Sequence, residues 1–208
     1  KPKWMRNKIN WNSEEKYDVI IARGSINYLN KEQLKKLLSM LNVGGFYIDN
    51  RGMAAGKTQL MAIIARQAKE LGYDVGYIAH RISLIANSAK RLALENYEDL
   101  KPLDMPDIQS MAICVNSLAK RYFSEFFTGR YVVFIDEIKQ VLEHIVNGTV
   151  DKTARDIVFN VLRLVIQNAH LVVAADADLD QPTLNYLKSC RPVTAQIKSD
   201  LSGKPPVV

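Results

Sequence analysis

The stretch Tyr131-Val-Val-Phe-Ile-Asp136-Glu137 decides the fold class of this chain. An uninterrupted apolar run that ends in two acids predicts a strand at Tyr131–Ile135 that is buried on both faces. We expect a helix at Glu137–Val146 directly after it. Strands without polar alternation belong to parallel sheets that helices cover on both sides, so this stretch predicts an α/β fold.

The same alternation of strands and helices runs along the rest of the chain. We expect further strands at Asp18–Ile21, Phe46–Asp49, Asp74–Ala79, Ile113–Asn116, Leu171–Ala175 and Thr194–Lys198. We expect further helices at Lys31–Leu41, Thr58–Leu71, Ile82–Glu95, Ser117–Phe127, Thr153–Asn168 and Pro182–Lys188. The pattern predicts one α/β domain with a mainly parallel sheet and helices on both faces.

A second stretch, Gly52-Met53-Ala54-Ala55-Gly56-Lys57-Thr58, lies between an expected strand and an expected helix. In that context, backbone N–H groups and the positive end of the helix hold phosphates. We expect Lys57 to reach the β- and γ-phosphates of ATP and the Thr58 hydroxyl to bind Mg²⁺. In the strict phosphate-loop pattern the first glycine falls on Arg51, so Gly52 is one place late. The alternative is a chance Gly-Lys-Thr after a strand.

The two acids after the apolar strand predict the second half of an ATPase site. Asp136 would hold Mg²⁺ through water, and Glu137 would orient or deprotonate the attacking water. A strand-to-helix junction also favours acids for capping, which explains either residue alone. Capping does not explain why the pair occurs together with a phosphate loop upstream.

A third apolar strand ends in acids at Ala174-Ala-Asp176-Ala-Asp178. Ligands collect at the carboxyl edge of parallel sheets. Asp176 or Asp178 would therefore sense the γ-phosphate or couple it to a neighbouring domain, and we assign Asp178 to the nucleotide site. Capping of the next helix by Asp178 or Asp180 ahead of Pro182 explains these acids equally well.

Polar residues at two other strand ends predict contacts with nucleic acid. They are His80, Arg81 and Ser83 after one strand, and Asn116, Ser117 and Lys120 after another. Side chains of these kinds and helix N-termini bind phosphate backbones. Ordinary solvated loop ends are the alternative for any single residue. No ladder of aromatic residues accompanies them, so base stacking is not indicated.

The composition is compatible with these expectations. A net charge of +6 and a pI near 9.2 suit a polyanionic partner. Cys114 and Cys190 lie far apart, and three scattered histidines support no zinc site, so we expect reduced thiols in a cytoplasmic protein. No run approaches the roughly 20 apolar residues of a membrane span. The opening Lys1-Pro-Lys-Trp4 suggests a piece of a longer chain.

From about Phe46 to Leu187 the sequence resembles the first RecA-like domain of superfamily 2 helicases. It is most similar to replication helicases related to herpesvirus origin-binding protein and to plasmid replication proteins of cyanobacterial type. The motifs that carry the resemblance are Gly52–Thr58 (motif I), Ile78-Ala-His-Arg-Ile-Ser-Leu84 (motif Ia), Val115-Asn-Ser-Leu118, Ile135-Asp-Glu-Ile-Lys-Gln-Val-Leu142 (motif II) and Ala174–Asp178 (motif III). In motif I, that family tends to show Pro-Met-Gly-x-Gly-Lys-Thr.

The resemblance implies a RecA-like P-loop NTPase fold, ATP and Mg²⁺ as cofactors, and DNA, single-stranded or an origin-type duplex, as a partner. It divides the chain into an N-terminal extension (1–45), an ATPase domain (46–192) and the start of a linker to a second RecA-like domain (193–208). Because motifs IV to VI and their arginine finger belong to that second domain, we expect this chain alone to hydrolyse ATP slowly. The resemblance leaves the oligomeric state open.

Other classes of P-loop protein remain alternatives. An AAA-type loader or a partitioning ATPase also uses an adjacent Asp-Glu pair, but Arg81 and Asn116 at the strand ends favour the helicase. A small-molecule kinase fits less well, because an Asp-Glu pair after a long apolar strand suits activation of water. A non-catalytic, nucleotide-gated interaction module is the last alternative, since the phosphate loop departs from the strict pattern.

Overall fold

A computed structural model describes residues 6–11, 19–22, 38–51, 56–148 and 152–199. Within these residues a single sheet contains nine strands in the order β2-β1-β9-β3-β8-β7-β4-β6-β5. Their bounds are Arg6–Trp11 (β1), Val19–Ala22 (β2), Gly45–Asp49 (β3), Asp74–Ala79 (β4), Glu95–Asn96 (β5), Ser110–Cys114 (β6), Tyr131–Asp136 (β7), Leu171–Ala175 (β8) and Ala195–Ser199 (β9). The strands from β9 to β5 pair in parallel, whereas β1 pairs antiparallel with β9 and β2.

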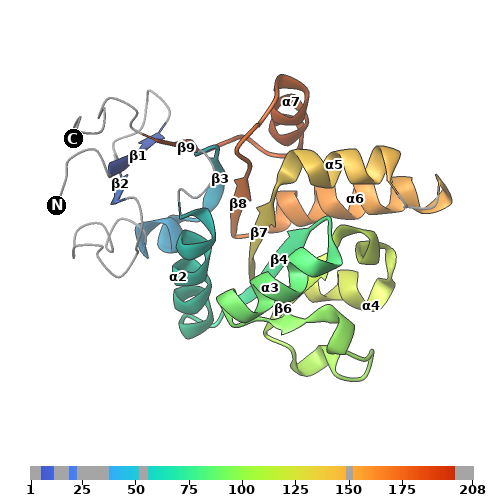
Figure 1. Cartoon of the computed structure of the whole chain (residues 1–208). Coiled ribbons are helices and arrows are strands. Elements are labelled where there is room, and N and C mark those ends of the chain that lie inside the picture. Colours follow the sequence, from blue (N-terminus) through green and yellow to red (C-terminus); the bar gives the residue numbers. More distant parts are fainter. Residues whose placement is uncertain (1–5, 12–18, 23–37, 52–55, 149–151, 200–208) are drawn as a thin grey trace.

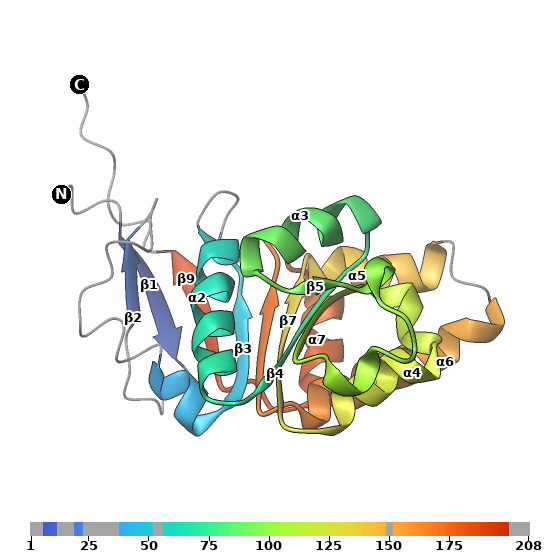
Figure 2. The ribbon, with the colours of Figure 1, turned by 90° about the horizontal axis from the view of Figure 1, so that it is seen from below.

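Helices cover both faces of this sheet (Figure 1). The helices are α2 (Lys57–Glu70), α3 (Ile82–Leu92), α4 (Arg121–Ser124), α5 (Ile138–Asn147), α6 (Lys152–Asn168) and α7 (Gln181–Cys190), with 3-10 segments at Tyr97–Asp99 (η3), Met105–Asp107 (η4), Val115–Ala119 (η5) and Glu125–Thr128 (η6). Helices α2 and α3 lie on one face, and α5, α6 and α7 pack together on the other (Figure 2). The predicted α/β fold with a mainly parallel sheet is confirmed.

The central strands are buried because their sequences are apolar on both faces. Every residue of β8 is buried, as are all residues of β7 before Asp136 and all residues of β4 after Asp74. These strands pair in register, with Ile78 opposite Ile135 and Ile135 opposite Ala174. Sheet burial of this kind is the main apolar contribution to stability, so the three strands form the centre of the core.

The expectation of a single helix at Ser117–Phe127 is wrong. The segment forms η5, α4 and η6 instead, and the preceding strand ends earlier, at Cys114. Phe127 leaves helical geometry, with φ −90° and ψ 28°, and its ring lies against Gly76 of β4. The expected helix is broken earlier, at Lys120, whose extended backbone (φ −79°, ψ 119°) separates η5 from α4.

The edge of the sheet at β1 and β2 lies outside the segment that resembles helicases. Strand β2 falls close to the expected Asp18–Ile21, whereas β1 was not expected. Strand β9 confirms the expected strand at Thr194–Lys198, so the sheet extends into residues assigned to the linker. The expected helix Lys31–Leu41 lies mostly outside the described residues. Residues 38–43, which the structure describes, are helical. The division into an extension, a domain and a linker stays a prediction.

Two expectations from composition can be compared with the described part of the chain. Both cysteines are free and buried. None of the helices described is long and apolar enough to cross a membrane.

Substituting Gly76 tests the close packing of Phe127 on β4. A Cβ at Gly76 would lie 2.4 Å from Cε1 of the buried Phe127 ring. We expect Gly76→Ala to lower the free energy of unfolding by about 1–3 kcal/mol, as overpacking does. Urea denaturation measures this change. The control is Gly129→Ala, whose Cβ would meet only Asp74 Oδ2, at 3.5 Å; an equal loss in both variants would contradict the packing.

Candidate functional site

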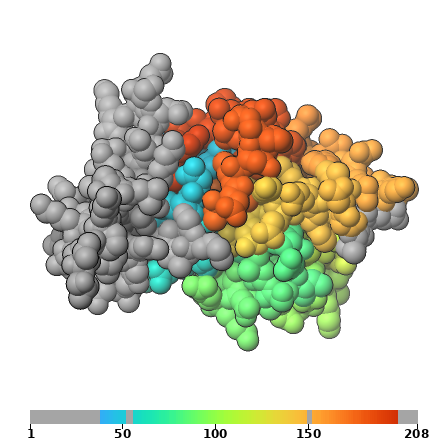
Figure 3. All heavy atoms as spheres, turned by 45° about the horizontal axis from the view of Figure 1, so that its top comes forward, coloured from blue at the N-terminus to red at the C-terminus, as the bar shows by residue number. Residues whose placement is uncertain are grey.

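The carboxyl ends of the parallel strands gather the predicted site residues at one edge of the sheet. Asp49 at the end of β3 and Asp136 at the end of β7 both pair with Ala175 at the end of β8. The segments that follow β4, β7 and β8, coloured green, yellow and orange in Figure 3, meet on one face of the molecule. This edge is where ligands bind in open α/β sheets.

The start of α2 holds the described part of the phosphate loop, since residues 52–55 lie outside the described residues. Gly56 has a left-handed backbone, with φ 80° and ψ 22°, and Lys57 begins the helix. The Lys57 ammonium donates a hydrogen bond of 2.8 Å to the carbonyl oxygen of Arg51. Thr58 is half-buried, and no acid lies in the first turn of α2. The positive end of this helix is therefore not neutralised by its own side chains.

Arg51 occupies the position of the first glycine in the strict phosphate-loop pattern, and the structure shows how the chain accommodates it. Its guanidinium makes two hydrogen bonds to Asp49, of 2.7 Å to Oδ1 and 2.6 Å to Oδ2. Both side chains are buried, with 1% and 0% of their surface exposed. Bidentate pairing neutralises the buried carboxylate, and the arginine side chain points into the protein, where its Nη1 has no hydrogen-bond partner among the described residues.

The acidic pair lies within the field of the phosphate-loop lysine. Burial raises the pKa of Asp136, and the Lys57 charge opposes this rise. Burial also raises the pKa of Glu137, as do the charges of Asp136 and Asp176, whereas Arg81 and Lys57 lower it in part. The structure thus brings Lys57, Asp136 and Glu137 together, as the sequence suggested, while their individual roles stay predictions.

The acids after β8 divide into different structural roles. Asp176 is buried and accepts hydrogen bonds from the backbone N–H groups of Lys139 (2.9 Å) and Asp178 (2.8 Å). Asp180 caps α7 by accepting from the Thr183 N–H. Asp178 is exposed. Of the two acids expected as candidate caps of the next helix, the structure shows Asp180 in that role. Assignment of Asp178 to the nucleotide stays a prediction.

The residues expected to contact nucleic acid are not equally accessible. Arg81, Ser83 and Lys120 are exposed. Ser117 is buried and hydrogen-bonds to Tyr97, while Asn116 is half-buried with an unpartnered Oδ1. We name these three residues the basic rim, because they alone among the six are exposed to solvent; the Lys120 ammonium also lies over the Phe123 ring, 5.9 Å from its centroid.

His80, the remaining member of that group, faces the acidic pair. Its ring is buried, neither nitrogen has a hydrogen-bond partner in the described part of the chain, and Nδ1 lies 3.7 Å from Glu137 Oε2. That distance exceeds a hydrogen bond. Burial and the charges of Arg81 and His144 lower the pKa of His80, which favours the neutral form of its ring.

The donor set fits Mg²⁺ bound together with a nucleotide. Mg²⁺ is commonly held by one or two protein oxygen ligands together with water and substrate phosphates. Thr58 and Asp136 provide a hydroxyl and a carboxylate at the same edge. Within the described ranges, no group of three or more His, Cys, Asp or Glu side chains forms a self-sufficient metal site. Thr58 and Asp136 therefore suit a Mg²⁺ site in which nucleotide phosphates and water supply the remaining ligands.

One contact at this edge was not expected from the sequence. The Tyr77 hydroxyl donates a hydrogen bond of 2.8 Å to Asp136 Oδ2. Tyr77 lies within an apolar strand, and nothing in the pattern distinguishes it from a core aromatic residue.

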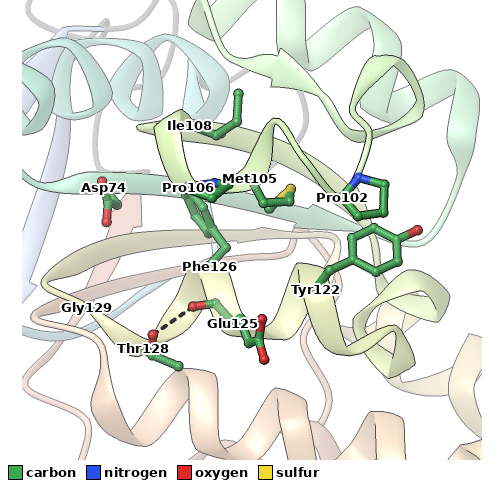
Figure 4. Close-up of a pocket in the computed structure, with 10 residues that line it drawn as sticks. All are labelled: Asp74, Pro102, Met105, Pro106, Ile108, Tyr122, Glu125, Phe126, Thr128 and Gly129. Atoms are coloured by element: carbon green, nitrogen blue, oxygen red, sulfur yellow. Dashed lines mark hydrogen bonds between the residues drawn. The ribbon is translucent and has the colours of Figure 1, made fainter.

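A pocket of about 320 Å³ lies at the opposite edge of the sheet (Figure 4). Its lining includes Asp74 at the start of β4, Gly129 just before β7, and Tyr122. Thr128 and Glu125, which also line it, are joined by a hydrogen bond from the Thr128 hydroxyl to the Glu125 carbonyl. None of the predicted site residues lines this pocket, so it plays no part in the predicted chemistry.

No protein-family profile matches the sequence. A search of curated proteins finds one similar sequence. It is 26% identical over 141 residues to an uncharacterised protein of Picosynechococcus sp. strain PCC 7002. The match covers 64% of this chain but 14% of that protein. The chain therefore corresponds to a small part of this relative.

Solved structures with a similar fold include an ATPase core and two helicases. The SWI2/SNF2 ATPase core of Sulfolobus solfataricus, solved with double-stranded DNA, has a TM-score of 0.54 at 16% identity, covering 82% of this chain and 36% of that one. The UvsW helicase of bacteriophage T4 has a TM-score of 0.53 at 14% identity, and the match covers 82% of this chain and 67% of the helicase chain. The Hef helicase domain of Pyrococcus furiosus has a TM-score of 0.55 at 10% identity, and the match covers 84% of this chain and 38% of the Hef chain. The fold is thus the RecA-like fold of helicase cores.

Substitution of Asp176 tests its role in joining β8 to the start of α5. Asp176→Ala leaves the half-buried N–H groups of Lys139 and Asp178 without their acceptor, so we expect a loss of about 1–3 kcal/mol in the free energy of unfolding for the two hydrogen bonds together. The matched control is Asp178→Ala, which removes an exposed carboxylate and should change stability by less than about 0.5 kcal/mol. Equal effects in urea denaturation would show that the two hydrogen bonds do not stabilise this edge.

Proposed function

We propose that this chain is the ATP-binding motor domain of a DNA helicase or translocase. The observation that carries the proposal is the convergence of Lys57, at the start of α2, with Asp136 and Glu137 at the end of β7. A positive helix end with a lysine suits phosphates, and an acidic pair beside it suits a metal ion and a water molecule. The RecA-like fold supports this reading.

The proposed chemistry assigns one task to each group. Lys57 exchanges its hydrogen bond to the Arg51 carbonyl for the β- and γ-phosphates of ATP. Thr58 and Asp136 would hold Mg²⁺, which neutralises charge on the phosphates. Glu137 orients the attacking water and accepts its proton. Its raised pKa brings the carboxylate closer to the range in which a general base works.

The basic rim is the proposed contact with the phosphate backbone of DNA. Arg81 is the residue before α3, and Ser83 lies in the first turn of that helix, whose N–H groups also suit phosphate. Lys120 follows η5. His80, Asn116 and Ser117 would support this surface from within, because their side chains are wholly or partly buried.

A complete motor would need more than this chain. We infer that a second RecA-like domain of the same protein closes on the nucleotide and supplies the groups that speed hydrolysis, because the described chain spans only part of the solved cores. The resemblance of motifs I, Ia, II and III supports a role in replication of a plasmid, phage or other mobile element, in the cytoplasm. Alternating closure and opening would then move the protein along DNA.

Removal of the phosphate-loop lysine tests the nucleotide site. We expect Lys57→Ala to weaken binding of a non-hydrolysable ATP analogue in Mg²⁺ by about 10- to 100-fold, the effect of losing a hydrogen bond to a charged group. Calorimetric titration measures the affinity. Lys69→Ala is the control, since Lys69 lies in the last turn of the same helix and bonds to the Ala93 carbonyl. Equal affinities for wild type and Lys57→Ala would refute the site.

Salt dependence tests the basic rim. We expect labelled single-stranded DNA to bind with an affinity that falls as salt rises, and we expect Arg81→Ala and Lys120→Ala each to reduce the slope of log affinity against log salt by about 1. Lys101→Ala is the control, because Lys101 adjoins the pocket at the opposite edge. Nucleotide binding without any DNA binding would instead favour a nucleotide-gated loader or partner switch.

A further inference from the structure

A chain of hydrogen bonds connects α3 with the carboxylate of Asp136. The Ser88 hydroxyl, on α3, donates to the Tyr77 hydroxyl over 2.9 Å. The Tyr77 hydroxyl donates in turn to Asp136 Oδ2 over 2.8 Å. Tyr77 has none of its surface exposed and Ser88 has 4%. The chain of bonds therefore runs through the protein interior, where hydrogen bonds strengthen one another.

The direction of these bonds is fixed by the chemistry of Tyr77. A carboxylate has no proton to donate, so Asp136 accepts the proton of the Tyr77 hydroxyl. Because that hydroxyl has a single proton, the Ser88 hydroxyl is the donor in the bond to Tyr77. A phenol of this kind cannot bind Mg²⁺ itself, but it restricts the plane of the carboxylate that would.

We propose that Tyr77 is a positioning residue for the metal carboxylate of Asp136 and that Ser88 anchors Tyr77 to α3. The inference rests on the proposed nucleotide site. Hydrogen-bond partners behind a metal ligand orient that ligand, and their loss commonly weakens metal binding 10- to 100-fold. Tyr77 lies on β4 beside β7, with Tyr77 opposite Phe134, so it reaches Asp136 from the neighbouring strand.

The test compares two tyrosines whose hydroxyls make hydrogen bonds inside the protein. Tyr77→Phe removes the donor to Asp136 and the acceptor of the Ser88 bond, whereas Tyr131→Phe removes a donor to the Val165 carbonyl at the other end of β7. Both variants keep the aromatic ring. Binding of a fluorescent ADP analogue to the chain is followed as Mg²⁺ is titrated, and thermal unfolding is measured without nucleotide.

We expect Tyr77→Phe to raise the half-saturating Mg²⁺ concentration by about 10-fold or more, with nucleotide affinity at saturating Mg²⁺ within about twofold of wild type. Ser88→Ala should shift the Mg²⁺ requirement in the same direction by a smaller factor. Tyr131→Phe should also lower the melting temperature, because it removes a buried hydrogen bond, and it should leave the Mg²⁺ requirement unchanged.

Two outcomes would overturn the inference. Either Tyr77→Phe has the Mg²⁺ requirement of wild type, or Tyr131→Phe shifts it by the same factor, which would make the effect a general loss of stability. A different result would count against the proposed function: wild type that binds the ADP analogue with no dependence on Mg²⁺, or does not bind it at all. The two failures are therefore distinguishable.

Discussion

The parallel, in-register pairing of β3, β8 and β7 is the constraint on which the rest of this structure depends. The last residues of these strands, Asp49, Ala175 and Asp136, stand side by side. Whatever follows each strand must then emerge at the same edge, and the returning helices carry the chain back across the faces. A slip by one residue would exchange the two faces of a strand and would move its last residue out of line with the ends of its neighbours. Because both faces of these strands are covered, the register that buries the apolar residues also aligns the acids.

Alignment of charged groups at a buried edge requires partners for each of them. Asp49 pairs with Arg51, and Asp176 accepts two backbone N–H groups. Asp136 accepts from Tyr77 and feels the Lys57 charge. An unpartnered buried charge would cost several kcal/mol. The departure from the strict phosphate-loop pattern follows the same logic, since the residue that replaces glycine is the one that neutralises Asp49.

The sequence predicts those parts of the fold that do not depend on distant contacts. Strands β4, β7 and β8 were predictable because an apolar run is buried whatever its neighbours are. The broken helix after β6 was not, because the residue types do not mark the extended backbone at Lys120. The packing of Phe127 on Gly76 was not predictable either, since it is a contact between segments far apart in the chain. In the candidate site, a phosphate loop at Gly52–Thr58 and an acidic pair at Asp136 and Glu137 could be proposed from residue type and spacing, and their roles stay predictions. The burial of His80 and the bond from Tyr77 to Asp136 were not, since the pattern of β4 does not show which polar atom meets which partner.

The backbone of Glu137 adds a separate argument for the use of its carboxylate. Its φ of 51° and ψ of 54° are left-handed, and within the described ranges the only other non-glycine residue with positive φ is Ala93. Such a conformation costs a non-glycine residue about 1–3 kcal/mol, whereas glycine adopts it freely. The turn between β7 and α5 is held on both sides, by Tyr77 on Asp136 and by Asp176 on the Lys139 N–H. A glycine in place of Glu137 would form this turn at a lower conformational cost. The strain at Glu137 is therefore consistent with a need for its carboxylate near Lys57.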